Sequence, residues 1–253
     1  MSFGWSGGSV VKAGEGFSDV SGLRSRRLRV VLHWRWLVRR IGKIREEERR
    51  GFRQRLDRRC WNRGERICRG LGFDNSYRVD AAGQSGGLWL FWRSWIGNVT
   101  VIESSDQIIQ ACVVNGEEML NLIIIYAAPS VIRRSGLWEK LREVVQGVTG
   151  PVLVGGDFNT IVRLDERSGG NGRLSADSVA FSQWMNELSL IDLRFKGNAF
   201  TWKRGRVERN IVKKRLDRVL CCTQARLKWQ EATVTHLPFF LLTMRCSTCN
   251  SAE

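Results

Sequence analysis

Two polar residues, Asp157 and Asn159, directly follow an apolar run in the segment VLVGGDFNTIV, residues 152–162. A carboxylate can take or orient a proton of a water molecule, and a carboxamide can donate hydrogen bonds to an anion. If the run is a strand, a two-residue step points both side chains to one side. The alternative is structural, because glycine permits positive φ and Asp and Asn cap turns. The segment therefore predicts either a reactive strand end or a strand followed by a turn.

Polar or aromatic residues also stand in three other segments that end or flank predicted strands. Tyr126 ends the predicted strand in the segment IIIYAAP. Thr201 and Trp202 lie in NAFTWKRG, and Asp217 lies in KKRLDRVL. Functional sites tend to be built at strand ends and loops carried by a rigid scaffold. These four residues are therefore candidates for the same site as Asp157.

The segments that must position these residues show both strand and helix patterns. Strands are predicted at 86–92, 98–104, 107–115 and 118–129 in an antiparallel pattern, and a further strand from Pro151 to Asp157. Helices are predicted at 137–146 and, with Ser175 as the cap, up to Leu188. The segments AFTW, RLDRVL and ATVTHLP predict three more strands or strand edges. The fold class is therefore α+β, a layered domain at residues 71–240.

Length and composition indicate a globular, intracellular chain. It has 253 residues, 43% of them hydrophobic and 26% charged, which is enough to bury a sizeable core. No apolar run approaches the roughly 20 residues of a membrane span, and no secretory signal is recognisable. Seven scattered cysteines, an odd number, do not form the pattern of a disulfide framework. We therefore expect no membrane association, no disulfide partner, and a nuclear or cytoplasmic location.

The formal net charge is +16, and most of it lies in the first third of the chain. Residues 1–78 hold 20 Lys and Arg against 8 Asp and Glu, whereas the rest of the chain holds 21 against 17. Basic patches attract nucleic acid by releasing counterions, without reading any sequence. Residues 1–23 are Gly/Ser-rich, and glycines interrupt the partly helical pattern of 24–63. We expect residues 1–70 to be a basic segment that is largely disordered or loosely helical. The alternatives are a basic helix that touches nucleic acid or a membrane surface, and a translated stretch with no evolved role.

Six motifs follow one another along the chain: SGGLWLFW, YAAP, GGDFN, FTW, RLDRVL and THLPFF. In this order and spacing they resemble the endonuclease/exonuclease/phosphatase family, in particular the endonuclease domain of plant LINE-type non-LTR retrotransposons. The resemblance covers about residues 71–240. It implies a four-layer fold in which two β-sheets pack face to face with helices on the outside. It also implies a Mg²⁺-dependent phosphodiesterase that nicks DNA with an activated water.

The same resemblance implies a role for each candidate residue. Hydrolysis of a phosphodiester needs a carboxylate for the water, donors for the developing charge, and a cation that clamps the oxygens. In the family's pattern Asp157 positions the water, Asn159 and Tyr126 hydrogen-bond the phosphate, and Asp217 orders the site. The residues expected to contact DNA are Thr201 and Trp202 at the rim and Lys203, Arg204, Arg215 and Arg218 along the backbone. The alternatives are a core position for Trp202 and a solvated hairpin for the basic residues.

The sequence departs from the family's pattern at both ends of the domain. The family begins with a strand that carries WN and a second strand that supplies the Mg²⁺-binding glutamate. Asn62 follows Trp61, but it lies only 24 residues before Gly86, too few for two strands and a helix, and Glu65 follows it too closely. The family ends with SDH, whereas here THLPFF, with the structural His236, is followed by LLTMR. The site is therefore expected to lack its principal metal ligand and its Asp–His pair, so the domain is incomplete.

The segment LLTMR, residues 241–245, can conceal the expected motif in another reading frame. The codons CTT CTG ACC ATG CGN encode it, and the same bases read from the third onward give Ser-Asp-His-Ala. We therefore predict that a one-base loss or a misplaced splice junction after Phe240 created an aberrant tail at 241–253. Sequencing the gene checks this prediction: CTG should encode Leu242 and ACC should encode Thr243, and any other codon at either position ends the hypothesis.

Three interpretations of function follow. The first is a DNA endonuclease domain of retrotransposon descent that is weakly active or inactive. The second is a basic nucleic-acid-binding protein without catalysis, and the third is a translated remnant without a selected function. Salt-dependent DNA binding without Mg²⁺-dependent nicking favours the second over the first, and failure to fold favours the third. Cys246 and Cys249 form a single C-x-x-C motif without two further ligands, so zinc is not expected.

Overall fold

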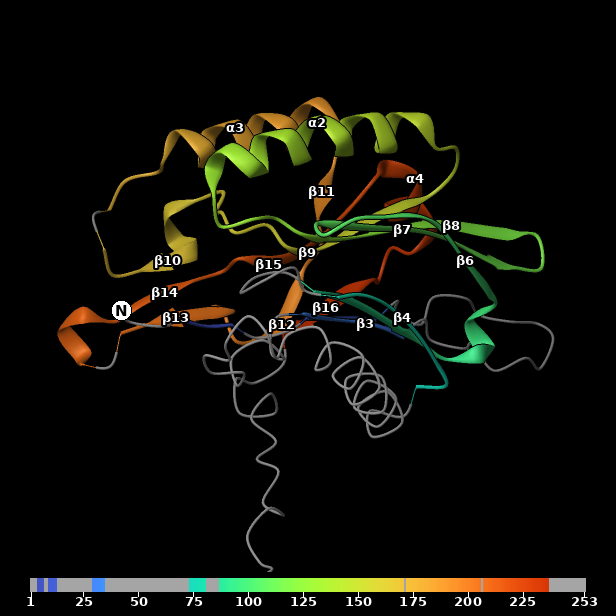
Figure 1. Ribbon diagram of the computed structural model, residues 1–253, viewed down its shortest axis with the longest axis horizontal. Helices are drawn as coiled ribbons and strands as arrows, with labels where there is room; N and C mark the ends of the chain where they lie inside the picture. Colours follow the sequence, from blue (N-terminus) through green and yellow to red (C-terminus); the bar gives the residue numbers. More distant parts are fainter. Residues whose placement is uncertain are drawn as a thin grey trace, which may run out of the picture.

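The computed structural model describes residues 4–6, 9–12, 29–34, 73–80, 87–170, 172–205 and 207–236. Within these residues the strands form two six-stranded sheets and one four-stranded sheet. Two long helices lie side by side over one face of the upper sheet in Figure 1. No helix among the described residues is long and apolar enough to cross a membrane.

The helix-covered sheet, which we call the central sheet, carries most of the predicted site. Its strands lie in the order β11 (Ile191–Asp192), β15 (Asp217–Cys221), β9 (Val152–Asp157), β8 (Glu118–Tyr126), β7 (Ile108–Asn115) and β6 (Asn98–Ser104). The two long helices are α2 (Val131–Gly147) and α3 (Ala176–Glu187). Because α2 connects β8 to β9 as a crossover, these two strands run parallel and both end at the same edge.

The other two sheets are named by their position. The second sheet packs against the uncovered face of the central sheet and has the order β12 (Phe195–Gly197), β16 (Thr233–His236), β2 (Ser9–Lys12), β3 (Arg29–Trp34), β5 (Leu88–Trp92) and β4 (Asn75–Val79). The arm sheet consists of β1 (Gly4–Ser6), β13 (Trp202–Arg204), β14 (Val212–Lys214) and β10 (Arg167–Ser168). The short helices are η3 (Ser94–Ile96), η4 (Leu164–Glu166), η5 (Glu208–Asn210) and α4 (Thr223–Lys228).

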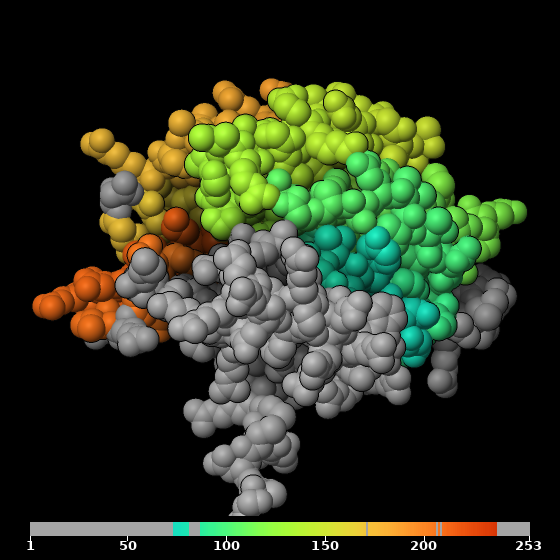
Figure 2. Space-filling view, viewed as in Figure 1, coloured from blue at the N-terminus to red at the C-terminus, as the bar shows by residue number. Residues whose placement is uncertain are grey.

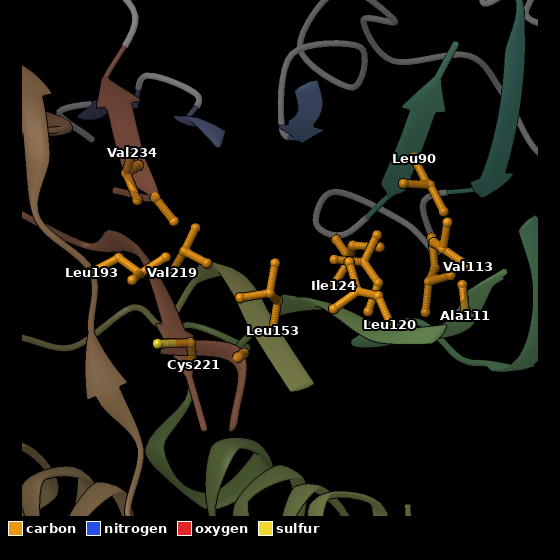
Figure 3. Packing of buried hydrophobic residues seen from close by; sticks show 14 of the residues in the cluster. Leu90, Ala111, Val113, Leu120, Ile124, Leu153, Leu193, Val219, Cys221 and Val234 are labelled. Carbon is orange, nitrogen blue, oxygen red and sulfur yellow. The ribbon is translucent and has the colours of Figure 1, made fainter. Parts of the chain in front are cut away.

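The central sheet is buried on both faces. On β8, Ile124 packs toward the second sheet, while Ile123 and Ile125 pack beneath the helices. Successive side chains of a strand point to opposite faces, so a strand between two layers requires an uninterrupted apolar run such as LIIIY. Figure 3 shows the core between the sheets, with Ile124 from the central sheet and Leu90 and Val234 from the second.

The second long helix begins and packs largely as its sequence predicts. The Oγ of Ser175, its cap, accepts a hydrogen bond from the backbone N–H of Ser178 at 3.1 Å. Phe181 and Trp184 are buried, which confirms their place on the predicted apolar face. Val179, predicted on the same face, is 46% exposed. This prediction was wrong because two residues of an α-helix differ by about 200°, which turns Val179 away from Phe181.

The predicted α+β class and the sandwich of two sheets are confirmed by this architecture. The strands at 98–104 and 118–126 form where the apolar pattern places them. The segment AFTW differs from its prediction, because the strand begins only at Trp202 and the preceding residue turns toward β15. Among the described residues, the long helices cover the central sheet alone, so three of the four expected layers are described.

Three strands come from the segment expected to be largely disordered or loosely helical. β2 pairs with β16, β3 pairs with both β2 and β5, and β1 pairs with β13. β2 and β3 therefore form the middle of the second sheet. The remainder of residues 1–70, including Asn62 and Glu65, lies outside the described residues, and so does the predicted tail at 241–253.

Candidate active site

Three strand ends of the central sheet bring Tyr126, Asp157 and Asp217 into one row. Tyr126 on β8 lies opposite Asp157 on β9, and Asp217 on β15 lies opposite Asp157 from the other side. Directly opposite residues point to the same face, and Tyr126 belongs to the core between the two sheets. The exposed fraction is 3% for Tyr126 and 0% for both aspartates. The structure thus places a phenol and two carboxylates side by side in a buried row.

The segment after β9 is both a strand end and a turn. Asp157 Oδ1 accepts a hydrogen bond from the backbone N–H of Asn159 at 2.6 Å, and Asn159 has a left-handed φ of 50°. Asn159 Nδ2 donates to the carbonyl oxygen of Ala127 at 2.6 Å. The chain has left the extended conformation here, so simple alternation does not place Asn159 beside Asp157. Instead, one of its two amide N–H donors ties the end of β8 to the end of β9.

Thr201 holds Asp217 in the row rather than lining an exposed rim. It is 2% exposed, so the prediction that it contacts DNA is wrong. Its Oγ1 accepts hydrogen bonds from the backbone N–H groups of Leu216 and Asp217, both at 3.0 Å. Its own backbone N–H donates to the carbonyl oxygen of Lys214 at 2.9 Å. Thr201 is therefore a positioning residue that fixes the start of β15.

Arg215 and Arg218, predicted to follow the DNA backbone, are buried in an ion-pair network. Their exposed fractions are 4% and 0%. Glu166 binds Arg215 at 3.0 Å and Arg218 at 2.8 Å, and Asp192 binds them at 2.7 and 2.9 Å. Two guanidinium groups face two carboxylates, so the network is neutral. The predicted DNA contacts of both arginines are wrong, because acidic residues distant in sequence meet them inside the fold.

The network supports the row from the opposite face of the central sheet. The guanidinium carbon of Arg218 lies 5.5 Å from the ring centroid of Phe181, on the helix side, whereas the preceding Asp217 belongs to the row. Burial raises the pKa of the Glu166 carboxyl, but the positive charges and hydrogen bonds of Arg218 and Arg215 outweigh it and leave that pKa below its usual value. Glu166 is therefore ionised and binds both arginines as a carboxylate.

His236 has a structural environment, as the sequence indicates. Its Nδ1 donates to the carbonyl oxygen of Asn198 at 2.7 Å, since a carbonyl can only accept. Its ring stacks on Phe195 with centroids 4.5 Å apart. Burial lowers the pKa of His236 to about 4, so the imidazole is neutral at pH 7.

The order of these elements agrees with a comparison of the sequence with known families. The sequence model of the endonuclease/exonuclease/phosphatase family matches residues 31–243, a span that contains the whole row. The chain belongs to this family. Among curated proteins, none matches it.

Three solved structures are similar to this chain at low sequence identity. The endonuclease domain of TRAS1, a telomere-specific non-LTR retrotransposon, is 15% identical over 59% of this chain and 67% of its own, with a TM-score of 0.49. The 3′ phosphatase NExo from Neisseria, bound to a product DNA hairpin, is 15% identical over 62% and 69%, with a TM-score of 0.41. TDP2 from C. elegans is 16% identical over 62% and 50%, with a TM-score of 0.38. Because every one of these TM-scores is below 0.5, none of these likenesses supports a conclusion about this chain.

The described residues do not complete the metal site that the family resemblance implies. Asp157 and Asp217 are the two carboxylates of the row, and no group of three or more His, Cys, Asp or Glu among the described residues could hold a metal ion. Mg²⁺ needs near-octahedral oxygen ligands, and the third member of the row is a phenol. β2 and β3, in the middle of the facing sheet, have the sequences SVVK and RVVLHW without an acidic residue. The described part of the chain therefore does not fit a resident Mg²⁺.

The remaining predicted DNA contacts, Trp202, Lys203 and Arg204, lie together on β13 of the arm sheet. Trp202 and Lys203 are half-buried, and Arg204 is exposed. The connection between β13 and β14 projects from the side of the molecule (Figures 1 and 2). Lys214 Nζ lies 5.7 Å from the ring centroid of Trp202. Trp202 is thus not a fully buried core aromatic. The arm sheet, with its lysine and arginine side chains, lies beside the row of Tyr126, Asp157 and Asp217.

Glu166 and Asp192, the acidic half of the ion-pair network, were not predicted from the sequence. A signal for them exists in RLDRVL, where Arg215 and Arg218 accompany a single aspartate at the start of an apolar strand. Arginine is almost never fully buried unless it is paired, so a buried strand of this composition requires two acidic partners elsewhere in the chain.

Proposed function

We propose that this chain is a DNA-binding domain of retrotransposon descent whose endonuclease site cleaves DNA weakly or not at all. The observation that carries this proposal is the row of Tyr126, Asp157 and Asp217, which is assembled in register but has no third carboxylate beside it among the described residues. The motifs SGGLWLFW and THLPFF support an origin in a plant LINE-type element. A nuclear or cytoplasmic location belongs to the same proposal.

Each residue of the row keeps a distinct role in this proposal. Asp157 orients the attacking water, while the phenol of Tyr126 and the second N–H of the Asn159 carboxamide hydrogen-bond the phosphate oxygens. Asp217 orders the row from the neighbouring strand. A bound Mg²⁺ would supply the charge that stabilises the transition state, and this is usually the largest contribution to the rate. Without a third carboxylate, which the described residues do not provide, the row retains positioning but little catalysis.

A plasmid assay tests the proposal. The purified full chain is incubated with supercoiled plasmid and Mg²⁺, beside an Asp157→Ala variant prepared in the same way. We expect no difference between their nicking rates, because no third metal-binding carboxylate lies beside the row among the described residues. A clear nicking rate that disappears in Asp157→Ala would show an intact site and overturn the proposal of weak or absent cleavage.

The second candidate is a basic nucleic-acid-binding protein without catalysis. The basic residues of the arm sheet favour it. Lys203, Arg204, Lys213 and Lys214 lie on the two paired strands β13 and β14. Together with a net charge of +16, they predict binding that weakens steeply with salt. Salt-dependent binding together with no Mg²⁺-dependent nicking by either protein would favour this second function over a weakly active endonuclease.

A further inference from the structure

A second row of side chains crosses the arm sheet. Lys214 on β14 lies opposite Trp202 on β13 and opposite Arg167 on β10, so all three side chains share one face. The Lys214 ammonium lies 5.7 Å from the Trp202 ring centroid, within cation–π range. A Cβ on Gly170 would lie 3.8 Å from the guanidinium carbon of Arg167, so the guanidinium lies over that glycine. Lys214 is therefore held against an aromatic ring, and Arg167 lies opposite Lys214 on the same face of the sheet.

These two cations have no anionic partner among the described residues. No carboxylate of the described chain lies within ion-pair distance of Lys214 or Arg167, and Arg167 Nη2 is buried without a hydrogen-bond partner. Buried donors in folded proteins nearly always have an acceptor, and an unsatisfied one destabilises the fold. The arrangement therefore needs an acceptor that the described residues do not provide.

Other charges nearby increase the need for an anion. Burial lowers the pKa of Lys214, and the positive charges of Arg167 and Arg134 lower it further. The one carboxylate among these groups, Asp177, is bound to Arg134 at 2.7 Å. Three cations thus face one carboxylate, and the excess lies at Lys214 and Arg167.

We propose that Lys214 and Arg167 bind one phosphate group of a nucleic-acid strand, with Trp202 holding the Lys214 ammonium in place. This rests on the proposed function as a DNA-binding domain. The planar fork of a guanidinium and a neighbouring ammonium match the several acceptor oxygens of a phosphate. One such group satisfies the buried Arg167 N–H and offsets the excess charge.

The site is connected to the candidate active site by hydrogen bonds of backbone and side chains. The Lys214 carbonyl oxygen accepts from Thr201 N–H, and Thr201 Oγ1 accepts from Asp217 N–H. On the other side, Arg134 Nη1 donates to the carbonyl oxygen of Ala128, two residues beyond Tyr126. A phosphate bound here would hold the strand beside the row of Tyr126, Asp157 and Asp217.

The opposite face of the arm sheet supplies a matched control. Lys213 adjoins Lys214 in sequence, lies on the same strand, and points to the other face, opposite Lys203 and Ser168. Replacing either lysine with glutamine removes the same charge from the same strand. A diffuse attraction to DNA responds equally to both changes, whereas a built phosphate site responds to one of them.

The test measures binding of the full chain to a labelled DNA oligonucleotide by fluorescence anisotropy over a range of salt. We expect Lys214→Gln and Arg167→Gln each to weaken binding about tenfold and to reduce the salt slope by about 0.7 to 0.9. Lys213→Gln should weaken it no more than about threefold, and Lys214→Arg should retain most of the affinity. Thermal unfolding checks folding, and Lys214→Gln should not lower Tm, because it removes a repulsion.

Three results would overturn the proposal of a phosphate-binding site at Lys214 and Arg167. Equal losses in Lys213→Gln and Lys214→Gln would show diffuse attraction, and unchanged binding in Arg167→Gln would remove the guanidinium from the site even if a Lys214 variant failed to fold. If inorganic phosphate raised Tm of the wild-type chain while the DNA affinities of all variants were the same, the site would bind free phosphate instead. In all three cases DNA binding itself survives; a wild-type chain that binds no DNA at low salt would overturn the proposed function as well.

Discussion

Replacing Arg218 with methionine is expected to lower the free energy of unfolding by about 3–5 kcal/mol. The guanidinium is fully buried and binds Glu166 and Asp192 at 2.8 and 2.9 Å. Methionine preserves much of the apolar stem, so the loss reports on charge rather than on volume. Without Arg218, the buried Glu166 and the partly buried Asp192 share only Arg215, and one negative charge is left uncompensated. Urea unfolding followed by circular dichroism measures the change.

Two further variants separate the network from general effects of losing an arginine. Arg163→Met removes an arginine whose ion pair with Asp165 is exposed, so it should cost at most about 1 kcal/mol. The double variant Glu166→Gln with Arg218→Met restores a neutral cluster and should be less destabilised than the sum of the two single changes. If Arg218→Met cost no more than Arg163→Met, the network would not be what holds β15 in place.

The strands of the central sheet could be predicted because their sequences satisfy one local requirement. A strand covered on both faces must be apolar at every position, and the LIIIY run of β8 meets this condition without reference to any partner. The middle of the second sheet could not be predicted in this way. β2 and β3 are short stretches within a basic, Gly/Ser-rich segment, and their partners β16 and β5 lie far along the chain. Strand formation there depends on tertiary context rather than on local pattern.

The candidate site likewise has residues whose positions local sequence patterns predict and residues whose positions depend on tertiary contacts. Asp157 and Tyr126 follow apolar runs whose strands pair in parallel, so their adjacency follows from the order of the elements. Arg215 looks like a surface cation when its sequence is considered alone. Its burial depends on Glu166 and Asp192, which reach it only after the chain has folded. The positive charge of Arg215 by itself therefore wrongly predicts exposure to solvent.

Replacing Gly156 with alanine is expected to cost about 3 kcal/mol or more in the free energy of unfolding. Gly156 has a φ of +148°, which L-residues rarely adopt, and an added Cβ would lie 1.9 Å from the carbonyl oxygen of Ile125. That oxygen belongs to backbone of the neighbouring strand β8 and cannot move without opening the sheet. Gly156 and Ile125 are paired one residue before Asp157 and Tyr126, so the opening occurs at the row itself. Urea unfolding measures the cost.

The matched control is Gly136→Ala in α2. Gly136 is an exposed helical glycine whose added Cβ would meet nothing within 4 Å, so the same chemical change should stabilise the chain by about 0.5–1 kcal/mol. The opposite signs of the two changes isolate the close contact between β8 and β9 from the general effect of replacing glycine. A Gly156→Ala variant as stable as the wild-type chain would mean that β8 and β9 do not approach this closely. The register that places Tyr126 opposite Asp157 would then be wrong, and the row with it.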